Sequence, residues 1–72
     1  MHNDYFLTKP EEDVLKLISS FIAANGWPPT RAEISRQMGW SSSNAAEEVL
    51  KALDRKGRIQ ITRGISRGIR IL

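Results

Sequence analysis

The sequence predicts a small, mainly α-helical domain that ends in a two-stranded antiparallel β-hairpin. Three observations carry this prediction. Helix start signals precede three segments with apolar residues at helical spacing, a glycine follows each segment, and isoleucines alternate with polar residues near the C-terminus. The chain has 72 residues, which is the size of one domain. We therefore expect residues 1–72 to form a single domain, with residues 1–7 flexible.

The first helix is predicted over residues 9–24. Thr8 and Glu11 have the spacing of a capping box, in which each side chain binds the backbone N–H of the other residue. Apolar residues then recur at intervals of three and four until Gly26 ends the helix. The connector that follows contains Pro28-Pro29, which disfavours a helix there.

Two further helices are predicted to follow with a tight turn between them. Thr30 and Glu33 repeat the capping-box spacing, and Gly39 supplies a left-handed stop two turns later. The third helix is expected to run to about residue 56. Its predicted N-cap is Ser42, and Asn44 is the alternative.

The last segment, about residues 58–72, predicts a hairpin. Its apolar residues have a period of about 2, which is that of a β-strand. The loop between the two strands contains two glycines and two arginines. Because an isolated hairpin is barely stable in water, we expect its isoleucines to lie against the helices. These are Ile59, Ile61, Ile69 and Ile71.

Apolar residues of the three helices are expected to form the core rather than a ligand pocket. The members of this core are Leu15, Ile18, Phe21, Ile22, Ile34, Met38, Val49, Leu50 and Leu53. Trp27 and Trp40 are interpreted as packing residues. An exposed Trp27 would be the alternative, available for a contact.

Composition excludes several classes of function. With no cysteine and one histidine, the chain cannot form thiolate metal sites, disulfides or multi-histidine clusters. It is too short for a large enclosed active site, and no serine has a candidate base beside it. No apolar stretch approaches the roughly 20 residues that span a bilayer. We expect a cytoplasmic, non-enzymatic protein with no catalytic residue, metal, cofactor or membrane partner.

Charge is distributed unevenly along the chain. Residues 1–50 hold four basic and seven acidic residues, a net charge of −3, whereas residues 51–72 hold seven basic residues and one acidic residue, a net charge of +6. A basic segment can be only a solvated surface. A bias this one-sided favours a surface for a polyanion, with nucleic acid first and anionic membrane second.

Two short helices with a tight turn between them are typical of a helix-turn-helix, here about residues 31–51. The basic hairpin directly after them predicts the winged form, with three helices and a two-stranded wing. In this arrangement the N-terminal turns of the third helix enter the major groove. The candidate base-reading residues are Ser42, Asn44, Ala45, Glu47 and Glu48.

Each of these residue types can read a base. Asparagine pairs with an adenine edge, a carboxylate accepts from the cytosine amino group, and alanine contacts a thymine methyl. The two glutamates could instead only stabilise the helix N-terminus. Other residues must supply the contacts to phosphate and any arginine contact in the minor groove. These candidates are Thr30, Arg31, Lys51, Arg55, Lys56, Arg63, Arg67 and Arg70.

Five blocks carry a more specific signal. They are Pro28–Ile34, Asn44–Glu48, Leu50–Leu53, Arg55–Gly57 and Ser66–Arg70. Together they resemble the DNA-binding domain of the bacterial LexA repressor family, over about residues 8–72. The resemblance implies a nucleoid protein that binds a palindromic CTGT…ACAG operator and represses SOS genes. It also implies base contacts by the candidate base-reading residues, and backbone or minor-groove contacts by Arg55, Lys56 and Arg67.

The sequence departs from the family pattern at four positions. Family members often have Arg where this chain has Ser41 and Pro where it has Ser43, so the operator preference can differ. Arg58 and Arg63 replace residues that are commonly apolar or small, which adds sequence-independent attraction to phosphate.

The full-length repressors of this family continue into a domain that dimerises and, when the RecA filament activates it, cleaves itself with a Ser-Lys pair. These 72 residues contain no such domain. The chain is therefore either an excised DNA-binding domain or a naturally short phage- or plasmid-borne regulator. We expect a monomer that pairs as two copies on the operator, and contact with RecA only through the additional domain.

Two rival functions remain open. The winged-helix scaffold could be a protein-interaction module for an acidic partner. The basic segment alone could bind DNA without sequence preference, or bind an anionic membrane. Neither rival explains the glutamates beside Asn44.

Overall fold

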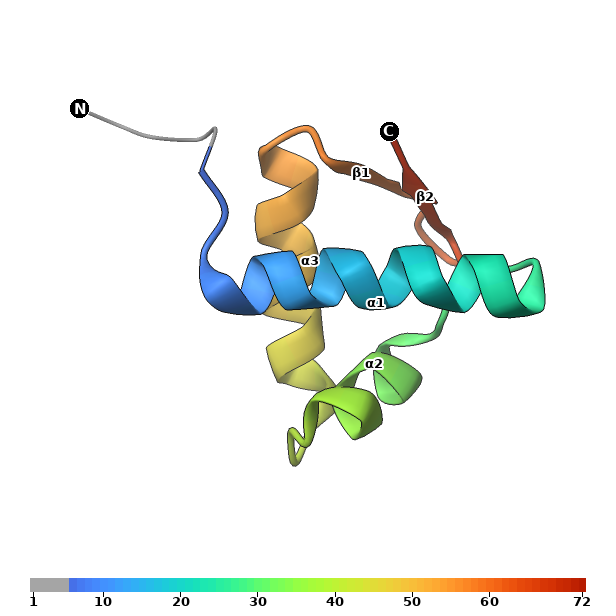
Figure 1. The fold of residues 1–72 in the computed structure, drawn as a ribbon, viewed down its shortest axis with the longest axis horizontal. Helices are drawn as coiled ribbons and strands as arrows, with labels where there is room; N and C mark the ends of the chain where they lie inside the picture. The colour runs from blue at the N-terminus through green and yellow to red at the C-terminus, as the bar shows by residue number, and fades with distance from the viewer. Residues whose placement is uncertain (1–5) are drawn as a thin grey trace.

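The computed structural model describes residues 6–72. It contains three helices and one hairpin, namely α1 (Lys9–Asn25), α2 (Arg31–Met38), α3 (Ser43–Arg55), β1 (Ile59–Ile61) and β2 (Ile69–Ile71). The long helix α1 crosses α3, α2 lies beside the N-terminal half of α3, and the hairpin follows the C-terminal end of α3 (Figure 1). This is the mainly helical, winged helix-turn-helix architecture that the sequence predicts. Of the segment expected to be flexible, residues 1–5 lie outside the described residues.

Local signals in the sequence explain where the helices begin. The predicted capping boxes are both present, with Thr8 at the start of α1 and Thr30 at the start of α2. The N-cap of α3 is Ser42, whose hydroxyl accepts a hydrogen bond from the Asn44 backbone N–H at 3.3 Å. The structure therefore selects Ser42 over Asn44 as the cap.

The turn between α2 and α3 is held by three features. Gly39 has a φ of 76°, a left-handed conformation that glycine adopts without steric cost. The Trp40 N–H donates to the Ser35 carbonyl at 2.8 Å, and the buried Ser35 hydroxyl donates to the Ser42 carbonyl at 2.9 Å. These bonds fix the first turn of α3 relative to α2.

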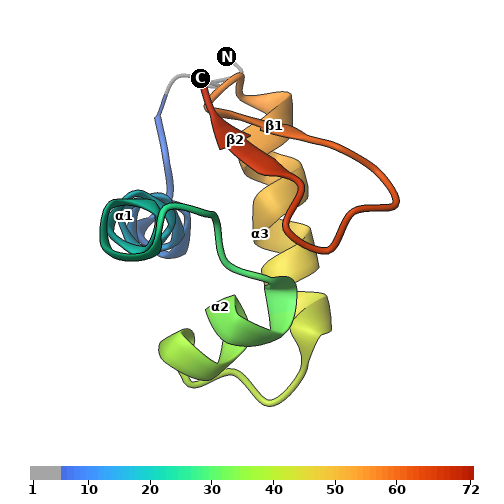
Figure 2. The same ribbon diagram turned by 90° about the vertical axis from the view of Figure 1, so that its right-hand side faces the viewer.

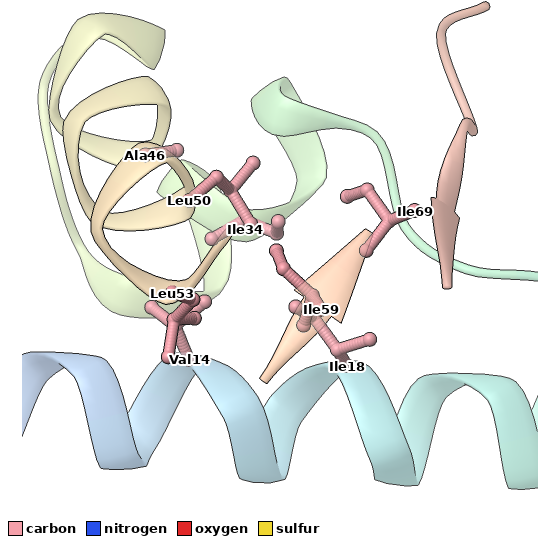
Figure 3. Packing of buried hydrophobic residues seen from close by; sticks show 8 residues of the cluster. All are labelled: Val14, Ile18, Ile34, Ala46, Leu50, Leu53, Ile59 and Ile69. Carbon is pink, nitrogen blue, oxygen red and sulfur yellow. The ribbon is translucent and has the colours of Figure 1, made fainter. Parts of the chain in front are cut away.

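The core lies where the three helices and the hairpin meet (Figure 3). Its members are Val14 and Ile18 of α1, Ile34 of α2, Ala46, Leu50 and Leu53 of α3, and Ile59 and Ile69 of the hairpin. All are at most 5% exposed. At about 25 cal/mol per Å², burial of this apolar surface is the main stabilising contribution.

Several expected core residues lie at its margin or outside it. Half-buried side chains packed against the core are Leu15, Ile22, Met38, Trp40, Val49 and Ile61. Phe21 is half-buried and lies under the Arg67 guanidinium instead. Trp27 is 52% exposed, so the packing interpretation is wrong for this residue, and its availability for a contact stays a prediction. In the connector Pro29 is fully buried, whereas Trp27 lies at the surface.

Ile71 also differs from expectation, because it is 37% exposed. It pairs with Ile59 in the antiparallel register. Since β1 packs directly on α3 and β2 is hydrogen-bonded to β1, the end of β2 lies farther from the helices. The hairpin therefore buries Ile59 and Ile69 fully, and Ile61 in part.

Candidate nucleic-acid interface

One face of the molecule combines α3 with the wing. Figure 2 shows α1 end-on at one side of α3, and the loop between β1 and β2 reaching out on the other side. A cleft of about 600 Å³ lies between α3 and this loop. Its lining residues are Arg31 of α2, Glu47, Lys51 and Asp54 of α3, and residues 61–66 of the hairpin. The cleft joins the predicted recognition helix and the predicted wing into one surface.

The structure brings the five candidate base-reading residues together in the N-cap and first two turns of α3. Ser42, Asn44 and Glu48 are exposed, whereas Ala45 and Glu47 are half-buried. Ala46 on the opposite side of the helix is fully buried in the core. The first turns of α3 are therefore held in place by their buried apolar side, and their polar side faces outward.

The two glutamates have unlike surroundings. The Glu47 carboxylate forms an ion pair with the Nε of Arg31, the first residue of α2. Glu48 pairs with Lys51 at 3.9 Å, and its side chain is 77% exposed. The pairing of two candidate DNA contacts with each other is a feature that sequence reasoning missed.

Lys56 is held inside the protein. Its ammonium group lies 2.7 Å from the Glu11 carboxylate and donates to the Phe6 carbonyl at 3.1 Å, and its side chain is only 11% exposed. Burial raises the pKa of Glu11, but hydrogen bonds from Lys56 and the Thr8 backbone outweigh it, so this pKa lies below its usual value. Lys56 thus joins the end of α3 to the start of α1, and its contact with DNA stays a prediction.

Arg67 is similarly engaged. Its guanidinium donates to both Glu33 oxygens, at 2.8 and 3.0 Å, and to the Pro28 carbonyl at 2.9 Å. The hydrogen bonds from Arg67 and from the Thr30 backbone N–H lower the pKa of Glu33 from 4.5 to about 2. The bond to Glu33 raises the pKa of Arg67 in turn. Arg67 anchors the wing to α2, and its contact with DNA also stays a prediction.

The other predicted phosphate contacts differ in availability. Lys51, Arg55 and Arg63 are exposed, and Lys51 and Arg63 face each other across the cleft. Arg70 is exposed too, and it donates to the Gln60 amide oxygen on the neighbouring strand at 2.6 Å. The backbone N–H of Thr30 donates to the Glu33 carboxylate at 2.8 Å, so this group is already occupied.

Six cleft residues are absent from the sequence-based site set, among them Asp54 and Ile65. Asp54 follows Glu47 and Lys51 at helical spacing, so it lies on the same face of α3. Ile65 is 55% exposed at the wing loop. An isoleucine in a loop of glycine, serine and arginine is the sequence signal that would have identified it.

None of the helices within residues 6–72 has the length and hydrophobicity of a membrane span. The same part of the chain contains no group of three or more His, Asp or Glu side chains placed to hold a metal ion.

A helix whose first turns are exposed beside a basic hairpin defines the class of winged helix-turn-helix DNA-binding domains. The family model described as the LexA DNA binding domain matches residues 4–68. The chain belongs to this family, which confirms the resemblance seen in the sequence. The matched family is a DNA-binding domain, in agreement with the expectation of a non-enzymatic chain.

Curated relatives agree with this assignment. The LexA repressor of Haemophilus influenzae strain PittGG is 59% identical over 66 residues, which cover 92% of this chain and 32% of the relative. The LexA repressor of Marinomonas sp. strain MWYL1 is 58% identical over the same shares. That of Saccharophagus degradans is 58% identical over 93% of this chain and 33% of the relative. The chain spans about one third of the length of these relatives.

Proposed function

We propose that this domain binds double-stranded DNA sequence-specifically and represses transcription of DNA-damage-response genes at a palindromic operator of the CTGT…ACAG type. One observation carries the proposal. The five candidate base-reading residues lie in the N-cap and first two turns of α3, three of them exposed and two half-buried, beside the wing cleft. The name LexA repressor, borne by relatives that are 58–59% identical, supports the repressor role.

In the proposed complex α3 lies in the major groove. Asn44 pairs with an adenine edge, and Glu47 and Glu48 accept hydrogen bonds from cytosine amino groups. The wing lies over the adjacent backbone, with Arg63 at the phosphates or in the minor groove. The sugar-phosphate strand that separates the two grooves then lies along the cleft between Lys51 and Arg63.

A palindrome provides two equivalent half-sites, so two copies of the domain bind one operator. Half-sites one helical turn apart allow each copy to present α3 to the same face of the duplex. A single copy binds its half-site weakly, because affinity rises steeply only when the two copies are linked. We propose contact with a RecA filament only for a protein that also carries the additional domain of the full-length repressors.

A regulator with a shifted operator preference is the second candidate. Ser41 and Ser43 support it, because both are exposed at the start of α3, where the family often has Arg and Pro. A side chain at the entrance to the major groove can change both phosphate contact and base preference.

A binding titration tests the proposal. The domain is titrated against a CTGT…ACAG duplex, a scrambled duplex and anionic vesicles, each at two salt concentrations. We expect the palindrome to be preferred, and the preference to persist at the higher salt because base contacts depend less on counterion release than phosphate contacts do. Equal, salt-sensitive binding to both duplexes, or equal binding to the vesicles, overturns the proposal.

A further inference from the structure

The ion pair between Arg31 and Glu47 links the two helices of the helix-turn-helix across 16 residues of sequence. Arg31 directly follows the N-cap Thr30, so its backbone is fixed by the capping box of α2. Glu47 lies in the second turn of α3. The side chains are 25% and 34% exposed, so the pair sits at the edge of the interface with access to solvent.

The ion pair uses only one of the two carboxylate oxygens of Glu47. Arg31 donates through Nε to Oε1 of Glu47. Among residues 6–72, no hydrogen bond engages the Oε2 of Glu47 or the terminal nitrogens of Arg31. One carboxylate oxygen is therefore available to accept from a base. The guanidinium can donate to a phosphate at the same time, because it has five N–H groups in a rigid fork.

The pair also addresses an electrostatic difficulty. A glutamate in the major groove is repelled by the phosphates on both sides of it. A cation in contact with its carboxylate cancels that repulsion, and it holds a flexible side chain in one geometry before DNA arrives. Ordering such a side chain only on binding would reduce the affinity for DNA.

We propose that Arg31 is a positioning residue, which holds the Glu47 carboxylate in place to read one base pair of each half-site. The proposal rests on the sequence-specific DNA binding proposed above. It differs from the sequence-based expectation, in which Arg31 only attracts phosphate. It also differs from a purely mechanical role, in which the pair only joins α2 to α3.

The experiment measures base discrimination rather than affinity alone. Wild type, Arg31→Ala, Arg31→Lys, Glu47→Gln and the double variant Arg31→Ala/Glu47→Gln are titrated against the operator duplex. The same titrations use duplexes in which each base pair of the half-site is replaced in turn. Arg36→Ala is the matched control, because Arg36 is an exposed arginine in the last turn of α2, away from the cleft.

We expect Glu47→Gln to lower discrimination at one base pair by on the order of tenfold. Arg31→Ala lowers discrimination at that same base pair, and the double variant loses no more than either single variant, because the two residues act as one unit. Arg31→Lys keeps the positive charge without the fork, so it retains the salt dependence and recovers only part of the discrimination. Arg36→Ala leaves the discrimination profile unchanged.

Other outcomes overturn the proposal. If Arg31→Ala weakens binding to all duplexes equally and keeps the discrimination profile, Arg31 only attracts phosphate. If it lowers the thermal midpoint and keeps the profile, the pair is only a mechanical link. Should Arg31→Ala fail to fold, Arg31→Lys carries the same test. A wild-type domain without preference for the palindrome overturns the proposed function itself. Discrimination at the Glu47 base pair that stays unchanged in every Arg31 variant overturns the positioning role alone.

Discussion

The guanidinium of Arg67 forms two hydrogen bonds with the carboxylate of Glu33, at 2.8 and 3.0 Å. A further bond at 2.9 Å reaches the Pro28 carbonyl, and the guanidinium lies 5.9 Å from the centre of the Phe21 ring. The base of the wing is therefore tied to α1, the connector and α2 together. Because α2 also sets the start of α3, this cluster relates the wing to the recognition helix.

Arg67→Ala is expected to remove this anchor. The thermal midpoint of unfolding falls by a few degrees, and binding to the operator and to a scrambled duplex weakens to the same extent. If Arg67 also contacts phosphate, the affinity depends less steeply on salt concentration. Circular dichroism and titrations over a salt series measure the two effects. A base-specific loss would show that the backbone role is wrong. An unchanged thermal midpoint would show that the anchor is unimportant.

Glu33 makes the stability of the fold depend on pH in the acid range. Its pKa is lowered from 4.5 to about 2, first by the hydrogen bond from Arg67 and then by that from the Thr30 backbone. A lowered carboxyl pKa stabilises the fold above about pH 4.5, and this contribution is lost as the pH falls towards 2. We expect the thermal midpoint to drop over this range, and Glu33→Gln to flatten the drop. A carboxyl titration followed by NMR with a midpoint near 4.5 would contradict the lowered pKa.

Gly68→Ala is expected to distort the wing. A Cβ at this position would lie 2.5 Å from the Thr62 carbonyl oxygen and 3.0 Å from that of Ile65. Both are backbone atoms, so they cannot move aside without breaking the turn. We expect a loss of about 1–3 kcal/mol of unfolding free energy, measured by urea denaturation. Ser66→Ala is the control in the same loop, because Ser66 is exposed, and it should change stability by less than about 0.5 kcal/mol.

Asn44→Ala tests the recognition helix. The Asn44 side chain is exposed, and only its backbone N–H takes part in the cap of α3, so the substitution leaves the fold intact. We expect a loss of about 1–3 kcal/mol of binding free energy at the cognate site, together with relaxed discrimination at one base pair. Gln37→Ala, on the exposed side of α2, is the control and should bind as wild type does. Equal losses on operator and scrambled duplexes would exclude base reading by Asn44.

The helices and strands could be predicted closely because their signals are local. Capping boxes at Thr8 and Thr30, the left-handed Gly39 and the alternating isoleucines each act over a few neighbouring residues. The same periodicity placed the base-reading candidates on one face of α3. Burial was predicted less well at Trp27 and Ile71, since exposure depends on which surface covers a residue.

Side-chain partners far apart in the sequence were decided by the tertiary structure alone. Arg31–Glu47, Arg67–Glu33 and Lys56–Glu11 join residues that are 16, 34 and 45 positions apart. In the sequence, Arg67 and Lys56 look equivalent to Arg63, as positive charges available for phosphate. Only the packing of α1, α2 and the wing against α3 brings carboxylates to the first two and leaves Arg63 exposed. The chemistry of each residue can thus be read from its type, but its availability to DNA follows from long-range contacts that local patterns do not encode.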